Sequence, residues 1–499
     1  MGDATVRLAG GIPAALYVNG ELMKPRGGGT APILNPATET LLGMAPVGGL
    51  DDALAAIEAA RAAFDHGPWP TLSWSQRVSY LQRFYEALAA RAEAICELIV
   101  AEAGALRSNA RARQFDVPMK HFRHYLEMGE GERVRGLAPE LSAGPGGSQT
   151  LGTAFVVREP IGVIAAITPY NYPYFLNLVK SVPALLAGNT VVLKPSPHTP
   201  FEAIMLAVAA HEAGLPPGVF NVVTGGTEVG QLLASERRVD LVSFTGSDTI
   251  GSAIAAQAAP TLKRLVLELG GKSALIVRAD ANQKMALAQA LRGFTSHAGQ
   301  GCAMNTRVLI HNSIRREFVR QLADAARAVR VGDPADPASE MGPLIGSAAR
   351  DRVERYVAAG VQSGAKLQAG GRRPAHLERG FYFEPTFFDE VDPDSSIAQD
   401  EIFGPVGVVI GYDSDEQAIE LANRSRFGLR GGIISADVGR AYEMALRIRT
   451  GGLTLNGGAG TQLSEGPFGG VKRSGYGREL GRAGLDELTQ LKLIEIQAG

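Results

Sequence analysis

The sequence predicts an α/β protein with two domains built on open, largely parallel sheets, and a small β arm outside both. Short β-branched runs alternate with helical stretches, and these runs lie at 163–168, 190–194, 219–223, 241–244 and 264–269. Such alternation is typical of parallel strands joined by crossover helices. The chain has 499 residues, and a single hydrophobic core stops growing near about 250 to 300 residues. A second series of apolar runs follows Gly270-Gly271, which indicates a second domain.

A helical pattern precedes the first strand, between Asp51 and about Glu130. Its apolar residues recur at spacings of three, four and seven, which places them on one buried stripe: Leu81, Phe84, Leu88, Ile95 and Ile99. Cys96 lies beside this stripe. We therefore expect Cys96 to be a small buried side chain rather than a reactive thiol.

The helix after the second strand has clear boundary signals. Thr199 is a candidate N-cap, Pro200 suits the first helical position, and Glu202 would complete a capping box. Gly214 and Pro216 would end the helix. Its N-terminus then points out at the carboxyl edge of the sheet, where helix dipoles and free amides bind phosphates. The first sheet therefore looks like a dinucleotide-binding platform.

These signals give the predicted domain organisation. The dinucleotide-binding domain takes residues 1–137 and 161–269, and the second α/β domain takes 270–479, with strands at 273–277 and 307–311. The strand-like segments at 138–160 and 480–499 belong to neither sheet. Pairing of these segments across subunits would leave no exposed sheet edge. We therefore expect them to form an oligomerisation arm.

Composition excludes several classes of partner. The chain has 49 basic and 51 acidic residues and a formal charge of −2, so no overall field favours nucleic acid or an anionic membrane. No apolar run reaches the ~20 residues that span a bilayer. The start of the chain has no basic segment leading into an apolar one, and Val6 stands where a myristoylation motif needs Ser or Thr. With only two cysteines, we expect a cytoplasmic protein without disulfides.

Two residues suggest covalent chemistry. Cys302 lies in HAGQGCAMN, where small neighbours leave room for a substrate and offer backbone N–H groups to the sulfur. Glu268 ends an apolar strand, and only Leu269 separates it from two glycines. A carboxylate in such a partly apolar place has a raised pKa and can activate water near neutral pH. Together they suggest an acyl-enzyme that is formed on sulfur and then hydrolysed.

Polar residues at the strand ends are candidates for binding. Asn171, between two prolines, is most often a turn former, but its amide could donate to a developing oxyanion. The dinucleotide fingerprint G-x-G-x-x-G is absent. Gly246 and Ser247 instead follow a strand and start a helix, which suits an anion. Lys194 could pair with a ribose or phosphate.

The ordered set of motifs resembles the aldehyde dehydrogenase superfamily over about residues 30 to 492. In chain order the matching segments are ITPYNYP, PALLAGNTVVLKPS, FTGSDTIG, LELGGK, GQGC, EIFGPV, NRSRFGL and PFGGVKRSGYGRELG. The resemblance implies a catalytic second domain with Cys302 as nucleophile and Glu268 as general base. It also implies an oxyanion hole made by Asn171 and the Cys302 N–H, and an electrostatic role for Lys180. Because Glu268 is present, the coenzyme A acylating branch is disfavoured.

The resemblance also implies binding residues, with NAD as cofactor and no metal. Glu401 and Phe403 would hold the nicotinamide ribose and ring. The remaining cofactor contacts would come from Thr168, Pro169, Tyr170, Lys194, Ser196, Pro197, Gly230, Phe244, Gly246, Ser247, Ile250 and Leu269. The substrate tunnel would be lined by Leu176, Val179, Gly301, Phe468 and the loop 457–466. A homodimer or homotetramer is expected.

Three positions depart from the family pattern. Pro197 stands where a glutamate often accepts from the adenosine ribose, so NADP is no longer repelled and we expect it to be tolerated beside NAD. Tyr170 replaces the usual tryptophan. Val179 is small where many relatives place an aromatic, and the loop 457–466 has no basic residue. These features suggest a roomy, uncharged pocket for a hydrophobic aromatic or medium-chain aliphatic aldehyde.

Other functional classes remain open at this stage. Cys302 with His297 would make a cysteine hydrolase or esterase, although five positions on a loop rarely bring a thiol and an imidazole together. A non-catalytic binding protein on the same fold would have lost the cysteine or the base. A nucleic-acid binder would use the basic run KRSGYGR, which a charge of −2 disfavours.

Overall fold

The structure is a computed structural model that describes residues 14–131, 133–143, 145–147, 149–458 and 463–498. The start of the chain, where no targeting signal is expected, lies outside this range. Residues 459–462, part of the loop predicted to line the substrate tunnel, also lie outside it. No helix within the described residues is long and apolar enough to cross a membrane.

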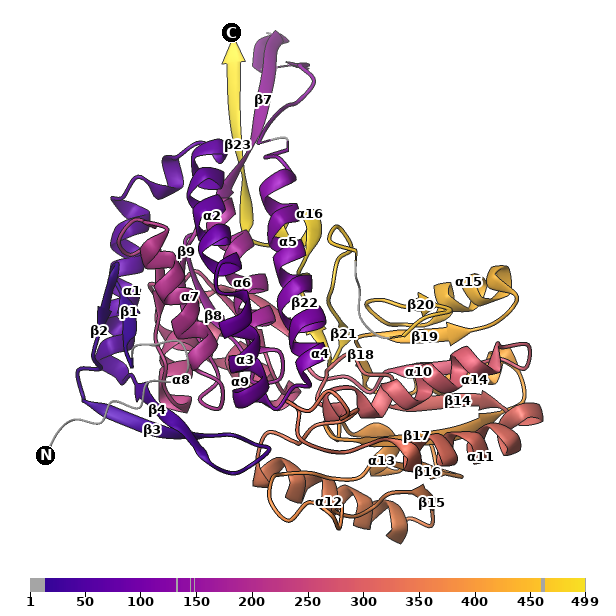
Figure 1. The fold of residues 1–499 in the computed structure, drawn as a ribbon. Helices are drawn as coiled ribbons and strands as arrows, with labels where there is room; N and C mark the ends of the chain where they lie inside the picture. The colour runs from indigo at the N-terminus through magenta and orange to yellow at the C-terminus, as the bar shows by residue number, and fades with distance from the viewer. Residues whose placement is uncertain (1–13, 132, 144, 148, 459–462, 499) are drawn as a thin grey trace, which may run out of the picture.

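The first sheet has eight strands in the order β2-β1-β10-β9-β8-β11-β12-β22 (Figure 1). Its five central strands run parallel and are the five predicted runs: β8 (Val163–Ile167), β9 (Thr190–Lys194), β10 (Phe220–Val222), β11 (Leu241–Thr245) and β12 (Arg264–Glu268). The antiparallel strands β1 (Leu16–Val18) and β2 (Glu21–Met23) extend one edge, and β22 (Gly475–Tyr476) pairs with β12 at the other.

Helices cover both faces of this sheet, which accounts for the largely apolar sequences of its central strands. One apolar cluster contains α2 (Trp74–Ala89), α3 (Ala92–Ala103), α5 (Asp116–Glu127), α6 (Pro173–Ala187) and α7 (Phe201–Glu212). A second cluster contains α1 (Leu50–Asp65), α8 (Thr227–Ser235) and α9 (Asp248–Ala258). Neighbouring strand residues alternate between the clusters, as pleating requires: Ile164 packs in the first and Ala165 in the second.

The predicted helical stripe is buried but lies on two helices. Leu81, Phe84 and Leu88 are on α2, Ile95 and Ile99 are on α3, and all five are fully buried. Ser73 caps α2 by accepting from the Gln76 N–H at 3.3 Å. Cys96 is 4% exposed within the same apolar cluster, which confirms the expectation of a structural thiol.

The predicted capping box at the start of α7 is wrong. Neither the Thr199 hydroxyl nor the Glu202 carboxyl has a hydrogen-bond partner among the described residues. The Phe201 N–H instead donates to Oε1 of Glu102 at 3.1 Å, from the end of α3. A carboxylate distant in sequence therefore takes the position that a local cap would fill, and Glu202 is left buried beside it.

The Glu102–Glu202 pair predicts an unusual dependence of stability on pH. Burial raises the pKa of both carboxyls, that of Glu202 to about 7, and the proximity of Glu202 raises the pKa of Glu102 further. The folded state thus holds a proton that the unfolded chain releases near pH 4.5, so stability should fall as pH rises from about 4.5 to about 7.

Glu202→Gln should therefore raise the thermal unfolding midpoint at about pH 8, where removal of a shift of this size contributes about 3 kcal/mol. The gain should shrink at about pH 5, because the native pair is protonated there. Glu212→Gln, on the exposed end of α7, is the control and should change stability little at either pH. An equal effect of Glu202→Gln at both pH values would contradict the raised pKa of the buried Glu202 carboxyl.

The second sheet has seven strands in the order β15-β16-β17-β14-β13-β19-β20. All run parallel except β15, and their bounds are β13 (Ala274–Val277), β14 (Arg307–His311), β15 (Lys366–Ala369), β16 (Thr386–Asp389), β17 (Val406–Tyr412), β19 (Gly431–Ile434) and β20 (Thr454–Leu455). One face packs on α12 (Ser347–Gln362), α13 (Ser396–Gln399), α14 (Asp415–Asn423) and α15 (Val438–Arg447). The other packs on α10 (Gln283–Thr295) and α11 (Asn312–Ala328).

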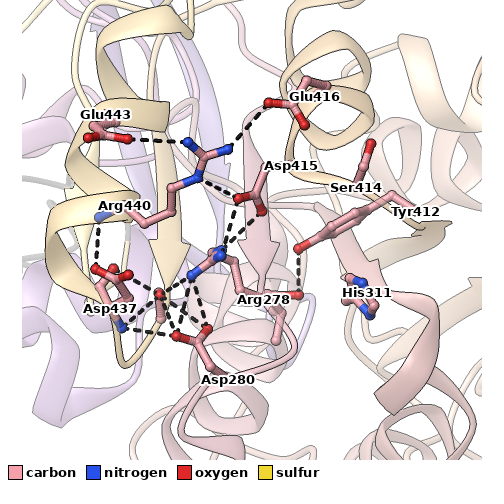
Figure 2. Close-up of polar contacts among 12 residues, drawn as sticks. Arg278, Asp280, His311, Tyr412, Ser414, Asp415, Glu416, Asp437, Arg440 and Glu443 are labelled. Carbon is pink, nitrogen blue, oxygen red and sulfur yellow. Dashed lines mark hydrogen bonds and ion pairs between the residues drawn. The ribbon is translucent and has the colours of Figure 1, made fainter.

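An ion-pair network lies at the carboxyl edge of this second sheet (Figure 2). Arg278, directly after β13, donates to both carboxylate oxygens of Asp415 at 3.0 and 3.2 Å. Arg440 donates to Asp415 at 2.7 Å, and Asp280 accepts from the Ser435 hydroxyl at 3.0 Å. Side chains of opposite charge thus satisfy one another at this edge. The predicted catalytic loop lies before β14, at the opposite, amino edge of the sheet.

The arm is a four-stranded antiparallel sheet that projects from the first domain (Figure 1). It contains β5 (Val134–Gly136), β6 (Glu140–Ala143), β7 (Gln149–Pro160) and β23 (Thr489–Ala498), and β7 pairs with β23 within the chain.

Two short strand pairs lie outside these three sheets: β3 (Gly29–Leu34) with β4 (Leu41–Val47), and β18 (Phe427–Gly428) with β21 (Val471–Lys472). The domain boundaries stay a prediction, and β22 joins the first sheet from within the range 270–479.

Candidate active site

The Cys302 loop, between α10 and β14, is held by the side chain of Gln300. This amide is fully buried and donates to the main-chain oxygens of His297 and Pro343 at 3.2 and 3.3 Å. Its oxygen accepts from the Ile345 N–H at 2.9 Å. Three bonds from one side chain therefore fix the loop two residues before the thiol. Sequence reasoning missed this role, although Gln300 stands within the GQGC motif.

The glycine pair between the two sheets allows the loop to pack close to the end of β12. A Cβ on Gly271 would stand 2.3 Å from the Cys302 carbonyl oxygen, and one on Gly270 would stand 2.5 Å from Oε2 of Glu401. The Gly271 N–H donates to Oε1 of Glu401 at 2.9 Å. A side chain at residue 271 would clash with the main chain, and one at residue 270 would force the Glu401 side chain to move. The pair thus brings Cys302 and Glu401 to the strand end that carries Glu268.

Asn171 faces the same loop. Its side-chain NH₂ donates to the Gln300 carbonyl oxygen at 2.9 Å, and the residue is 4% exposed. An amide NH₂ has two hydrogens, so this bond fixes the orientation of the group and leaves a second donor. Asn171 therefore lies against the loop that carries Cys302, and its part in an oxyanion hole stays a prediction.

Glu268 is 2% exposed, and neither carboxylate oxygen has a hydrogen-bond partner among the described residues. Burial raises its pKa well above 4.5, and the Glu479 carboxylate raises it further, while Lys180 and Arg478 lower it. A carboxyl in this state binds a proton more readily than an exposed one. Its environment suits a general base that takes a proton from water.

Lys180 forms a buried ion pair behind Glu268. Its ammonium donates to Oε1 of Glu479 at 2.6 Å and to the Ser243 hydroxyl at 3.0 Å. Sequence reasoning named Lys180 but missed Glu479, which lies 299 residues away in the chain. The available signal was the acidic residue in GYGRELG. Val179, predicted to line the substrate tunnel, is buried and faces a small cavity together with this pair.

The resting thiol of Cys302 is protonated. Burial raises its pKa, and the Glu401 and Glu268 carboxylates raise it further, while the N–H groups of Ala303 and of Cys302 itself lower it. The two N–H groups lie where they can stabilise a thiolate or an oxygen bound next to it. Ionisation therefore requires a base or a cation brought by the bound reactants.

The structure does not form the alternative Cys302–His297 dyad. Neither ring nitrogen of His297 has a hydrogen-bond partner among the described residues, and the ring packs edge-on against Tyr172 with centroids 5.3 Å apart. Burial lowers the pKa of His297 to about 4. The imidazole is thus neutral and makes no hydrogen bond to the thiol, as a hydrolase would require.

The basic run KRSGYGR is used within the fold. The Lys472 ammonium donates to the carbonyls of Asn423 and Ser425, and Arg473 pairs with Asp248 at 2.7 Å. Arg478 donates to the Gly470 and Gly477 carbonyls. These contacts account for the basic run without nucleic acid.

Within the described residues, no group of His, Cys, Asp and Glu could hold a metal ion.

The carboxyl edge of the first sheet fits a dinucleotide. Strand order reverses between β8 and β11, and ligands of open α/β sheets bind at such a switch point. Ser247 caps α9 by accepting from the Ile250 N–H at 3.3 Å, which confirms the predicted helix start and leaves other N–H groups free for an anion. The Thr245 hydroxyl, at the end of β11, is buried without a partner among the described residues.

The other predicted binding residues lie around this edge and the Cys302 loop. Tyr170 and Phe403 meet edge to face, with ring centroids 6.0 Å apart, beside Glu401. Lys194 donates to the Pro195 carbonyl at 3.1 Å, and burial lowers its pKa to about 8. Phe468 exchanges main-chain hydrogen bonds with Glu479. Leu176 and Gly301 are half-buried. The roles of these residues in binding remain predictions.

Comparison with known proteins agrees with this geometry. A model of the aldehyde dehydrogenase family matches residues 23–494. The chain is 38% identical over 485 residues to the betaine aldehyde dehydrogenase of Bacillus subtilis (strain 168), with 96% of each chain covered. It is 39% identical over 481 residues to a 3-succinoylsemialdehyde-pyridine dehydrogenase of a Pseudomonas species, with 96% of this chain and 97% of that protein covered.

The fold resembles that of a solved structure over almost the whole chain. Betaine aldehyde dehydrogenase from Staphylococcus aureus, in complex with NAD⁺, aligns with a TM-score of 0.93 at 33% identity, covering 99% of this chain and 97% of that one. This likeness confirms the predicted fold class. With the family model and the relatives, it establishes that the chain belongs to the aldehyde dehydrogenase family.

Proposed function

We propose that the protein oxidises an aldehyde to the carboxylic acid with NAD through a thioester on Cys302. The observation that carries this proposal is the meeting of Cys302, Asn171 and a buried, unpartnered Glu268 where the two sheets join. NAD, when bound, supplies the acceptor for the hydride that leaves the substrate carbon. Glu401 and Phe403 would hold its nicotinamide end, and the first sheet would bind the rest.

The residues of the chain divide the chemistry between them. The Cys302 sulfur adds to the carbonyl carbon, and the oxygen that becomes negative accepts from the Asn171 amide and the Cys302 N–H. After oxidation the carbon remains on sulfur as a thioester. Glu268 then takes a proton from water, the hydroxide adds to the thioester carbon, and the carbon–sulfur bond breaks to release the acid. The Cys302 thiolate regains a proton from the protonated Glu268. Lys180 holds Glu479 through an ion pair, and the Lys180 charge lowers the pKa of Glu268.

Two substrate classes are favoured by different observations. A hydrophobic aromatic or aliphatic aldehyde suits the apolar side chains of Leu176, Val179 and Phe468, which are predicted to line the substrate tunnel. The names of the relatives instead suggest betaine aldehyde, which carries a quaternary ammonium, or a semialdehyde bearing a pyridine ring. Aromatic faces can bind such a cation. The hydrophobic class is our first proposal and the cationic class the second.

A substrate panel at fixed NAD tests both classes. It compares benzaldehyde and octanal with betaine aldehyde and 4-aminobutanal, by kcat/KM from the rise in reduced nicotinamide. We expect the neutral aldehydes to exceed the cationic ones about tenfold, because an apolar pocket gives a desolvated cation no compensating charge, at a cost of about 1.4 kcal/mol. A preference for the cationic aldehydes would reject the hydrophobic class and support the second. Absence of oxidation with every aldehyde would reject the proposed reaction.

Pro197 leads us to propose that NADP is tolerated beside NAD. Pro197 is exposed and has no side-chain donor or acceptor, so no carboxylate at this position repels a 2′-phosphate. Pro197→Glu should lower kcat/KM for NADP by about 10- to 100-fold and leave that for NAD nearly unchanged, because a new charge near the phosphate costs about 1.4 to 3 kcal/mol. Pro197→Gln is the uncharged control. A thousandfold preference of the parent protein for one cofactor would contradict dual use.

We also propose that the arm binds a second copy of the chain. Apolar side chains on the described part of the arm are exposed, and they are Val134, Leu137, Leu141, Leu151, Phe155, Leu491, Leu493, Ile494 and Ile496. A monomer rarely exposes so many neighbouring apolar groups without a partner. Strands β5 and β6 also leave a sheet edge open to pairing. A homodimer or homotetramer would cover these surfaces.

A further inference from the structure

A small cavity lies at the amino edge of the second sheet, apart from the residues of the proposed reaction. Its volume is about 20 Å³, and its lining includes Lys272, Ser273, Arg307, Arg430 and Thr450. These residues come from the starts of β13, β14 and β19 and from the segment after α15. None of the described residues that line the cavity is Asp or Glu. The walls thus carry several cationic residues and no acidic one.

Two hydroxyl groups among these residues are unpaired. Ser273 Oγ and Thr450 Oγ1 are buried, and neither has a hydrogen-bond partner among the described residues. A buried hydroxyl without a partner costs about 1–3 kcal/mol. A hydroxyl can donate or accept a hydrogen bond. Because the described residues that line this cavity include cationic ones and no acidic one, a ligand there should be an anion, which accepts hydrogen bonds. A hydrogen-bond acceptor in the cavity would satisfy both hydroxyls.

The arginines keep the cavity positive. Arg307 is buried, and it donates from Nε to the Lys272 carbonyl and from its two Nη atoms to the Leu421 and Ala422 carbonyls, at 2.8 to 3.1 Å. These bonds hold the guanidinium without neutralising it. Arg430 is 9% exposed and lies close to Gly452, where a Cβ would stand 2.0 Å from Nη1. The absence of a side chain at residue 452 thus leaves room for this guanidinium.

Lys272 has no hydrogen bond from its ammonium to any described residue, although it is 2% exposed. Burial lowers its pKa to about 7, and the nearby Arg307 lowers it further, while the Glu401 and Asp400 carboxylates oppose this. An anion at the cavity would favour the charged ammonium in the same way that a carboxylate partner does.

From this geometry we propose that the cavity binds a small monovalent inorganic anion of the size of chloride, through Lys272, Ser273 and Thr450. A cavity of about 20 Å³ exceeds the roughly 10–15 Å³ that one water molecule requires. It is too small for a sugar acid or a nucleotide. Binding compensates the buried cations and supplies the acceptor that both hydroxyls lack. The proposal does not depend on the identity of the aldehyde or the cofactor.

Crystals of the full-length protein soaked in sodium bromide test the site directly. We expect an anomalous bromide peak in the cavity, within hydrogen-bond distance of Ser273 Oγ and Thr450 Oγ1, which chloride competes away. A water molecule or an empty cavity at saturating bromide would overturn the proposal.

Thermal unfolding in solution gives a second test. Sodium chloride is compared with sodium gluconate at equal ionic strength, because gluconate is too large for the cavity. The parent protein should gain stability with chloride only. The double variant Ser273→Ala with Thr450→Val should need about tenfold more chloride for the same gain, since two lost hydrogen bonds of about 0.7 kcal/mol each weaken binding about tenfold. Lys263→Met, a change at another poorly exposed lysine, should keep the parental response. Equal stabilisation by both salts, or an unchanged chloride response in the double variant, would contradict the site.

Discussion

Cys302→Ala is expected to abolish aldehyde oxidation, with a loss of about 10⁴-fold or more in kcat, because no other group near the loop can hold the substrate carbon. Gln300 fixes the loop through three hydrogen bonds that do not involve the thiol. The variant should therefore keep its fold. Initial rates from reduced nicotinamide measure the loss, and quenching of nicotinamide fluorescence should show that NAD still binds.

Cys96→Ala is the matched control, because Cys96 is the chain's other cysteine. Burial among apolar side chains raises the pKa of Cys96 to about 11, so it is a poor nucleophile. This variant should oxidise aldehydes at the parental rate and lose only modest stability. Oxidation by Cys302→Ala at the parental rate would exclude the thioester mechanism.

The sequence predicted the parts of the fold that depend on local patterns. Buried parallel strands are apolar on both faces, so β8 to β12 appear as continuous β-branched runs. Glu268 and Asn171 were found because each is a polar residue near the end of an apolar strand, and Cys302 was found because small residues surround its thiol. The signal in each case lies within a few residues of the chain.

The remaining features depend on contacts between distant segments. The predicted Thr199 cap was wrong because the Phe201 N–H donates to Glu102, a residue of another helix. Glu479 could not be assigned because its partner Lys180 lies 299 positions away. The need for glycine at residue 271 arises only when the Cys302 carbonyl packs against it. Such contacts are properties of the assembled chain, and no local pattern encodes them.

Glu268→Gln is expected to stop turnover after the thioester has formed. The amide cannot take a proton from water, so hydrolysis should slow by about 10²- to 10⁴-fold, the usual contribution of a general base. Reduced nicotinamide should then appear as a burst of a single turnover per active site, followed by a slow phase. Mass spectrometry of the stopped reaction should find the acyl group on Cys302.

The pH profile tests the same carboxylate independently. Burial raises the pKa of Glu268 well above 4.5, so the parental kcat should fall as pH drops below that raised value, because the protonated carboxyl no longer acts as a base. Glu268→Gln should lack this acidic limb. Glu420→Gln, an exposed carboxylate on α14, should retain both the limb and the rate. Steady turnover by Glu268→Gln without a burst would assign water activation to another group. Glu479, the carboxylate that raises the pKa of Glu268, would be the next to test.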